Sequence, residues 1–451
     1  MAELTVTNWY GDLVSHPKVV VDANSVDDVV RVLKDPARYP SPVRAVGSNH
    51  STAACAVVDG GTIIRMKMDR ILNIGPDTLT VEAGAVHINM AKELEKNNLQ
   101  FYVNTEIGSL SAGSAACAGT KDSSFPGEFG QVGSYIIAVK MVLPSGELLE
   151  VTEEKQPDLM RRVRSSYGTF GIIYEVTFRT RPMLPLAVHH KTYHLADFVQ
   201  QLPELKALNY AMMYYIFPFE DLITVEFRSY NPEASGEPDR IIWPLRNYIW
   251  GTSGPKFARD LGQTVSDPKI RFGILDKFNA LWRFKLENIV TSQNTVPADE
   301  IIDYPPVAND SRYTFSLFAF PEAEYPGVLA EFFQFCRDYY VKTGYRTDLL
   351  DVGYAIAQDQ QSLLSYSFDG PVMTIDPVST GNTGWKEFLA AYNEFCSDHG
   401  GKPLLNQTFG ITPAIARKAF DGKLDDFEST RKQFDPGGRL LNDYFRALLA
   451  A

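Results

Sequence analysis

The sequence has little of several features that would place it in other protein classes. Its four cysteines, Cys55, Cys117, Cys336 and Cys396, lie far apart, and no two of them form a CxxC pair. Zinc sites and disulfide frameworks usually need such spacing, so we expect free thiols. No run approaches the roughly 20 apolar residues that span a bilayer, and the first residues lack the basic and apolar stretches of a secretory signal. We therefore expect a cytoplasmic protein with no membrane partner.

Basic residues are also in deficit. Lys and Arg number 43 against 55 Asp and Glu, which gives a formal net charge of −12. A nucleic-acid partner needs a basic face, so this balance argues against one without forbidding a local positive pocket. Aromatic residues make up 12% of the 451 residues, so large rings are available to wall an apolar ligand site. A chain of this length predicts two domains, with three as an alternative.

The beginning of the chain lacks the signature of a Rossmann nucleotide-binding sheet. No GxGxxG follows a strand, and strands and helices do not alternate in the βαβ order. Apolar spacing and the capping residue Ser25 instead predict strands over 18–21, 61–66 and 79–85 and helices over 25–33 and 87–97. This order is typical of an α+β fold.

Two stretches rich in small residues stand out. Residues 43–51 run from a strand-like entry into Gly47, two small polar residues and His50, an arrangement whose backbone N–H groups could converge on a pyrophosphate. Residues 107–124 are almost entirely Gly, Ala, Ser, Cys and Thr, which suits close approach of a ligand or another backbone. The alternatives are an ordinary glycine turn for the first stretch, and tight helix packing or a linker for the second.

The remaining chain divides near two prolines. A hairpin is predicted over 136–151 with a Pro-x-Gly turn, and a strand is predicted over 174–179. Pro182 and Pro185 then mark a candidate domain boundary. From about 186 to 403, aromatic strands and helices predict a second α+β domain with an antiparallel sheet. Within it, residues 243–282 are expected to be irregular and to form a lid or an excursion.

Taken together, these blocks resemble the flavoproteins of vanillyl-alcohol oxidase/PCMH type, and within them the aldonolactone and alditol oxidases. The resemblance rests on residues 5–11, 44–51, 111–123, 168–177 and 435–444, which occur in the family's order. It implies a two-domain PCMH-type FAD-binding fold of the α+β class with an antiparallel-sheet substrate (cap) domain. The implied bounds are 1–183 for the FAD-binding domain, 184–404 for the cap, and 405–451 for a C-terminal segment returning to the FAD domain.

The resemblance also implies a cofactor and its contacts. FAD would place its pyrophosphate on the backbone of the first stretch and would be joined covalently to His50, with a non-covalent neighbour as the alternative. Cys117 is expected to be a free buried thiol. The implied cofactor-binding residues are Ala45, Val46, Gly47, Ser48, Asn49, His50, Ser51, Ser111, Ser114, Ala118, Gly119, Thr120, Ile172, Ile173 and Asn442.

The chain departs from the family at the substrate motifs. The Glu-x-Arg of polyol-oxidising relatives becomes Gly344-Tyr345-Arg346-Thr347, and Gln407 replaces the lysine of the His-Trp-Gly-Lys motif. A glutamine cannot act as a cation. Candidates to assist loss of the hydroxyl proton are Arg346, Gln407 and Tyr354, each with a structural role as its alternative. A sugar or polyol substrate is thereby in doubt, and a larger, less polar alcohol also suits the aromatic cap.

The expected function is oxidation of a CH–OH group of a small-molecule alcohol, polyol or lactone, with hydride transfer to FAD. Molecular oxygen is the expected acceptor, with release of hydrogen peroxide. One alternative is a dehydrogenase with a non-oxygen acceptor, for which the side chain at Thr105 is relevant. Another is a biosynthetic FAD protein that catalyses oxidative cyclisation or merely binds, because a fold does not fix a function. The sequence leaves the oligomeric state open.

Overall fold

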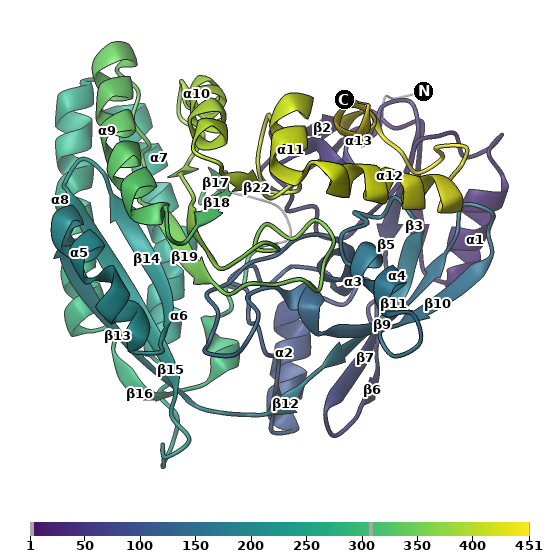
Figure 1. Ribbon diagram of the computed structural model, residues 1–451, viewed down its shortest axis with the longest axis horizontal. Helices are drawn as coiled ribbons and strands as arrows, with labels where there is room; N and C mark the ends of the chain where they lie inside the picture. Colours follow the sequence, from purple (N-terminus) through teal and green to yellow (C-terminus); the bar gives the residue numbers. More distant parts are fainter. Residues whose placement is uncertain (1–3, 306–309, 451) are drawn as a thin grey trace.

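Two groups of strands, one from each half of the chain, frame the molecule (Figure 1). The computed structural model describes residues 4–305 and 310–450. The first half forms a five-stranded antiparallel sheet of order β10-β9-β11-β7-β6 and a three-stranded parallel sheet of order β3-β5-β4. The second half forms an eight-stranded antiparallel sheet of order β16-β13-β15-β14-β19-β20-β18-β22. The mixed, largely antiparallel α+β architecture predicted from the sequence is confirmed.

The first half contains most of the predicted elements within a residue or two. Ser25 caps the first helix in a capping box with Asp28, as its position predicts. The elements are β1 (Val6–Thr7), β2 (Val14–Ser15), β3 (Val19–Ala23), α1 (Val26–Lys34), β4 (Val43–Val46), η1 (Ala54–Ala56), β5 (Thr62–Met66), β6 (Ile71–Ile74), β7 (Thr78–Glu82), α2 (His87–Lys96), β8 (Leu99–Gln100), α3 (Ala112–Cys117), η2 (Val132–Tyr135), β9 (Ile136–Val142), β10 (Leu148–Thr152), α4 (Pro157–Val163), β11 (Ile172–Arg179) and β12 (Arg181–Pro182).

The second half surrounds its sheet with helices on both faces. Strand β14 is buried throughout, and its alternate side chains enter two separate apolar clusters, because successive side chains of a strand point to opposite faces. The elements are β13 (Leu186–His194), α5 (Leu195–Ala207), β14 (Ala211–Phe217), β15 (Leu222–Tyr230), β16 (Ser292–Thr295), η4 (Pro297–Glu300), β17 (Thr314–Phe315), β18 (Phe318–Pro321), α9 (Tyr325–Thr343), β19 (Asp351–Ile356), β20 (Val372–Ile375), β21 (Val378–Ser379), α10 (Trp385–Asp398) and β22 (Lys402–Pro403).

Residues 243–282, expected to be irregular, are helical, and that prediction is wrong. They form most of α6 (Ile242–Tyr248), a π-helical turn η3 (Ile249–Ser253), α7 (Gly254–Thr264) and α8 (Pro268–Asn288). Pro268 lies in the first turn of α8, where a proline costs no intrahelical hydrogen bond, so it starts a helix instead of interrupting one. Pro255 lies in the first turn of α7, directly after the π-helical turn that joins α7 to α6, and the helical backbone continues past it. These helices cover the face of the large sheet opposite α5 and α9.

The end of the chain packs against its beginning. The helices α11 (Pro413–Phe420), α12 (Gly422–Phe434) and α13 (Asp443–Leu449) lie over the first half in Figure 1. Asn442 caps α13 and donates hydrogen bonds to the carbonyls of Ala54, Cys55 and Val57 at 2.9–3.3 Å. The domain bounds inferred from the sequence stay a prediction. Across the described residues, no helix is both long and apolar enough to cross a membrane.

Candidate functional site

A cavity of about 180 Å³ brings together the two stretches of small residues and the second half of the chain. Its wall includes the loop that leaves the carboxyl end of β4, the segment from 105 to 121, the start of β11, and aromatic residues of the cap. The predicted contacts that line it are Ala45, Val46, Gly47, Ser48, Asn49, His50, Ser51, Ser111, Ser114, Ala118, Gly119, Thr120, Ile172, Ile173, Tyr354 and Gln407. These residues thus share one space.

The loop after β4 is shaped by close packing against the second small-residue stretch. A Cβ at Gly47 would lie 2.1 Å from Ser111 Oγ, so this position admits only glycine without rearrangement. Asn49 adopts a left-handed φ of 55°, and its side chain donates to the carbonyl of Thr7 at 2.9 Å. The backbone N–H of Trp9 in turn donates to the Asn49 carbonyl at 2.8 Å. The N-terminal block therefore buttresses the loop.

Asn406 ties the two loops together and was missed by sequence reasoning. Its side chain donates to the carbonyl of Gly119 at 3.0 Å, and its own carbonyl accepts from the N–H groups of Thr52 and Ala53 at 3.1 and 3.3 Å. A Cβ at Gly119 would lie 2.1 Å from Leu404 Cδ1, so the glycine is needed for this approach. The available signal was its place beside Gln407 in a block already singled out.

Arg44 joins three blocks that lie far apart in the sequence. Its buried guanidinium donates to the carbonyls of Gly168 (3.2 Å), Leu440 (3.0 Å) and Tyr167. Tyr167 and Gly168 both have left-handed φ angles, 49° and 69°, which turn these carbonyls toward the cation. Burial lowers the pKa of Arg44. Three of the blocks that carry the family resemblance, residues 44–51, 168–177 and 435–444, are therefore in direct contact.

His50 is held at the cavity wall by stacking and a hydrogen bond. Its ring stacks on Trp9 with centroids 4.8 Å apart, and its Nε2 lies 2.5 Å from Ser109 Oγ. Its Nδ1 has no hydrogen-bond partner among the described residues. Burial lowers the pKa of His50 to about 3, so the imidazole is neutral at ordinary pH. A neutral, oriented imidazole with one free nitrogen is chemically able to act as a nucleophile.

The end of the cavity formed by Trp250, Tyr304, Tyr313 and Phe315 is called the aromatic end. Lys121 and Glu106 line the cavity there, and neither was predicted from the sequence. The Lys121 ammonium pairs with buried Asp376 and lies 4.4 Å from the centre of the Tyr354 ring. The Tyr354 hydroxyl donates to Glu106 Oε2 at 3.1 Å. Burial raises the pKa of Asp376 to about 6, against the opposing effect of Lys121. A cation, a phenol and a carboxylate therefore meet at one place.

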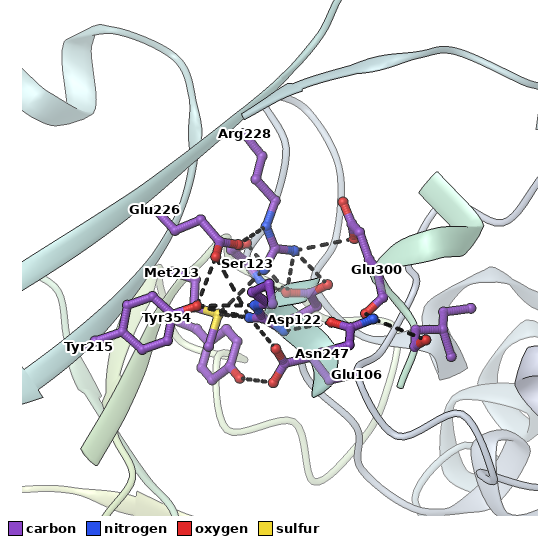
Figure 2. Close-up of polar contacts among 12 residues, drawn as sticks. Glu106, Asp122, Ser123, Met213, Tyr215, Glu226, Arg228, Asn247, Glu300 and Tyr354 are labelled. Carbon is purple, nitrogen blue, oxygen red and sulfur yellow. Dashed lines mark hydrogen bonds and ion pairs between the residues drawn. The ribbon is translucent and has the colours of Figure 1, made fainter. Parts of the chain in front are cut away.

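Glu106 belongs to a buried polar network (Figure 2). Its carboxylate forms an ion pair with Arg246, which also donates to the Tyr215 hydroxyl at 3.0 Å and lies 3.6 Å from Glu226. Because α6 supplies Arg246 and β14 supplies Tyr215, the cap fixes the position of a carboxylate that the first half contributes. Breaking such a buried pair on one side leaves an uncompensated charge.

The same network continues around Arg228. Its guanidinium contacts Glu226 at 2.6 Å, Asp122 at 3.2 Å and Glu300 at 3.3 Å (Figure 2). Burial raises the pKa of Glu300 to about 8, although Arg228 opposes the shift. The neighbouring carboxylates Asp122 and Glu226 act in the same direction as burial. The carboxylates in this network are Glu106, Asp122, Glu226 and Glu300.

Two predicted residues lie away from the cavity wall. Arg346 forms an ion pair with Asp276 of α8, and its guanidinium lies 4.2 and 5.1 Å from the rings of Phe219 and Phe272. It is thus occupied within the cap, and we propose no catalytic role for it. Asn442 supports the loop behind Cys55 through the hydrogen bonds described above and does not line the cavity. Cys117 is buried and unpaired, as expected.

The cavity fits a flat, polar-edged cofactor such as FAD. Besides Glu106, whose Oε1 forms the ion pair with Arg246, four lining residues have a buried polar atom without a hydrogen-bond partner in the described parts of the chain, and such atoms are costly unless a ligand or water satisfies them. The glycines at 47 and 119 leave room for close approach of a ligand to the backbone. The four atoms are Arg44 Nε, Thr105 Oγ1, Asn406 Oδ1 and Gln407 Oε1.

Comparison with known proteins agrees with this geometry. Residues 17–152 match a family described as an FAD binding domain, and residues 356–448 match one described as D-arabinono-1,4-lactone oxidase. L-gulono-1,4-lactone dehydrogenase of Mycobacterium tuberculosis is 23% identical over 449 residues, 98% of each chain. L-gulonolactone oxidase of Bos taurus is 23% identical over 239 residues, 52% of this chain and 54% of the relative.

Solved structures show the same fold. A solvent-stable cholesterol oxidase has a TM-score of 0.74 at 16% identity, with coverage of 99% of this chain and 97% of that chain. Chitooligosaccharide oxidase has a TM-score of 0.66 at 12% identity, with coverage of 98% and 96%. The architecture is therefore the PCMH-type FAD-binding fold that the sequence blocks predict.

Gly47→Ala is expected to weaken FAD binding by at least about tenfold, because the added Cβ must displace Ser111 and the loop it touches. The measurement is the dissociation constant from fluorescence titration of flavin-free protein with FAD, made with His50→Ala present in every variant so that binding is non-covalent. Gly262→Ala is the matched control, since a Cβ at that helical glycine meets nothing within 4 Å. Unchanged binding in Gly47→Ala would show that the loop does not approach the cofactor.

Proposed function

We propose that this chain is an FAD-dependent oxidoreductase of the vanillyl-alcohol oxidase/PCMH family, and that its reaction is the oxidation of a CH–OH group in a small-molecule alcohol or lactone. The observation that carries the proposal is the continuity of one cavity from the glycine loop, through His50, to Lys121, Tyr354 and Glu106. FAD, when bound, supplies the hydride acceptor. The names of the relatives and of the matching family include lactones, which supports a lactone as the substrate.

The chain's own residues account for the hydroxyl proton. We assign Tyr354 to accept this proton on its phenol oxygen while its own proton passes to Glu106, to which it is already hydrogen bonded. Lys121, whose ammonium lies against the Tyr354 ring, stabilises the negative charge that develops on the substrate oxygen. Gln407 contributes a side-chain oxygen with no partner among the described residues, which can accept a second substrate hydroxyl.

This assignment places the site's cation differently from the family motif. Gln407 replaces the lysine of the motif, but Lys121 supplies an ammonium from the small-residue stretch 107–124. The four rings of the aromatic end favour, as a second candidate, a larger and less polar alcohol over a sugar lactone.

We propose molecular oxygen as the electron acceptor, with a non-oxygen acceptor as the alternative. The names of the relatives include both a dehydrogenase and an oxidase, so they do not decide between the two. Thr105 lines the cavity and is buried, in keeping with the position expected to influence access of oxygen. We also propose that the flavin is covalently attached through His50, supported by its neutral imidazole and unpaired Nδ1.

Anaerobic mixing with a panel of alcohols, lactones and amines is expected to bleach the flavin absorbance with at least one alcohol or lactone. Readmission of air should then restore the absorbance and release hydrogen peroxide. Bleaching without peroxide would identify the dehydrogenase alternative. No bleaching by any compound would contradict the proposed reaction and favour the cyclisation or binding alternative.

Lys121→Met is expected to slow anaerobic flavin reduction by about 100-fold with unchanged flavin content, because a methionine keeps the volume and removes the charge. Since the change also leaves Asp376 buried without its cation, Lys121→Met with Asp376→Asn is the control for lost stability. Stopped-flow absorbance measures the rate. A rate within twofold of the parent protein would exclude an electrostatic role for Lys121.

His50→Ala is expected to abolish covalent attachment while leaving some FAD bound non-covalently, because the alanine removes the nucleophile but not the loop. The measurement is flavin fluorescence of the protein band after denaturing electrophoresis. Ser109→Ala, which removes only the partner of Nε2, is the matched variant and should retain attachment. Retention of flavin by denatured His50→Ala would place the anchor elsewhere, and its release from the denatured parent protein would contradict covalent binding.

A further inference from the structure

A second, smaller cavity of about 30 Å³ lies behind the aromatic end of the main one. It is enclosed by η3, α7, α8 and residues 348–350. Its wall is mainly apolar, with Ala258, Leu275, Phe278, Trp282 and Leu350 as typical members. A cavity of this character gives water few partners and suits apolar atoms.

Two side chains, Trp250 and Tyr313, line both cavities. Their ring centres are 5.9 Å apart, and the Tyr313 hydroxyl is hydrogen bonded to that of Tyr304. The barrier between the two spaces is therefore a pair of aromatic rings. Among the described residues, the two that line both cavities carry no charge.

The position of Trp250 is fixed by its backbone. It lies in the π-helical turn η3, a type of irregularity that is frequent at functional sites. A Cβ at Gly251 would lie 2.8 Å from Ile302 Cγ2, and one at Gly254 would lie 2.8 Å from the carbonyl oxygen of Ile249. Gly251 within the turn and Gly254 directly after it are thus both tightly packed. The indole is held as a wall and is itself almost fully buried.

We propose that Trp250 determines how large a substrate the enzyme accepts, because its indole closes the main cavity off from the small apolar cavity behind it. In the native chain, an apolar edge of the substrate rests on the Trp250–Tyr313 barrier. With the indole removed, the two cavities join and a longer apolar chain extends between α7 and α8. This inference rests on the proposed oxidation of an alcohol or lactone in the main cavity. It adds that the site limits the length of the apolar part of the substrate.

Binding of unreactive probes tests this role of Trp250 without turnover. The probes are straight-chain primary amides from propanamide to octanamide, which have no CH–OH group, and the readout is the perturbation of the flavin absorbance of the holoenzyme. In the native protein, the dissociation constant should stop improving once the chain reaches the barrier. In Trp250→Ala, it should continue to fall by about fourfold for each further methylene, as expected for burial of a CH₂ group.

A matched variant refills the new space. Ala258 lines only the second cavity, so Ala258→Leu added to Trp250→Ala should abolish the gain for long amides and leave the short amides unchanged. Trp250→Leu keeps more of the packing and should show a smaller gain in affinity for long amides. It replaces Trp250→Ala in the test if the alanine variant does not fold.

Three results would overturn the inference. They are an identical chain-length dependence in native protein and folded Trp250 variants, a continued gain beyond the barrier in the native protein, and no amide binding to any variant. Failure of the proposed function has a separate signature. In that case no alcohol or lactone reduces the native flavin, whatever the amides show.

Discussion

The site depends on one buried guanidinium that collects backbone carbonyls from distant parts of the chain. Arg44 bonds to carbonyls at 167, 168 and 440, and no carboxylate neutralises it at hydrogen-bond distance among the described residues. Such a charge is tolerated in the interior only while these acceptors stay in place. The strand that ends in the glycine loop, the start of β11 and the C-terminal segment are therefore held in one arrangement. The loop at Gly47 owes its position to this arrangement.

A second set of charges fixes the cap to the first half of the chain. Asp122 and Glu106 come from the first half, and Arg228 and Arg246 come from the second. Removing either guanidinium would leave carboxylates buried without a partner, so the two halves are mutually dependent in stability. The consequence for the site is that Glu106 and Tyr354, contributed by different halves, keep a hydrogen bond across the cavity.

The sequence predicted what local patterns and small residues encode. Ser25 capped a helix because its chemistry acts within one turn, and the stretches around Gly47 and Gly119 lined a cavity because glycine marks close approach. Lys121 and Glu106 escaped notice because their meeting with Tyr354 is a product of tertiary packing that no spacing reveals. The pairing of Arg346 with Asp276, 70 residues away in the sequence, was hidden for the same reason, and its catalytic role stays a prediction. Residues 243–282 were expected to be irregular but are helical, in part because a proline in the first turn of a helix, such as Pro268, is compatible with the helix.

The packing of the C-terminal helices against the first strands has a consequence for biosynthesis. The N–H of Val43 donates to the carbonyl of Arg439, and Arg44 bonds to Leu440, 396 residues further along the chain. Contacts of this separation form only after the intervening chain exists, and they slow folding because a long loop must close first. The loop that would receive FAD thus stays incomplete on the ribosome until the chain has been made through residues 439 and 440. A product terminated before these residues lacks the carbonyl groups that hold Val43 and Arg44 in place.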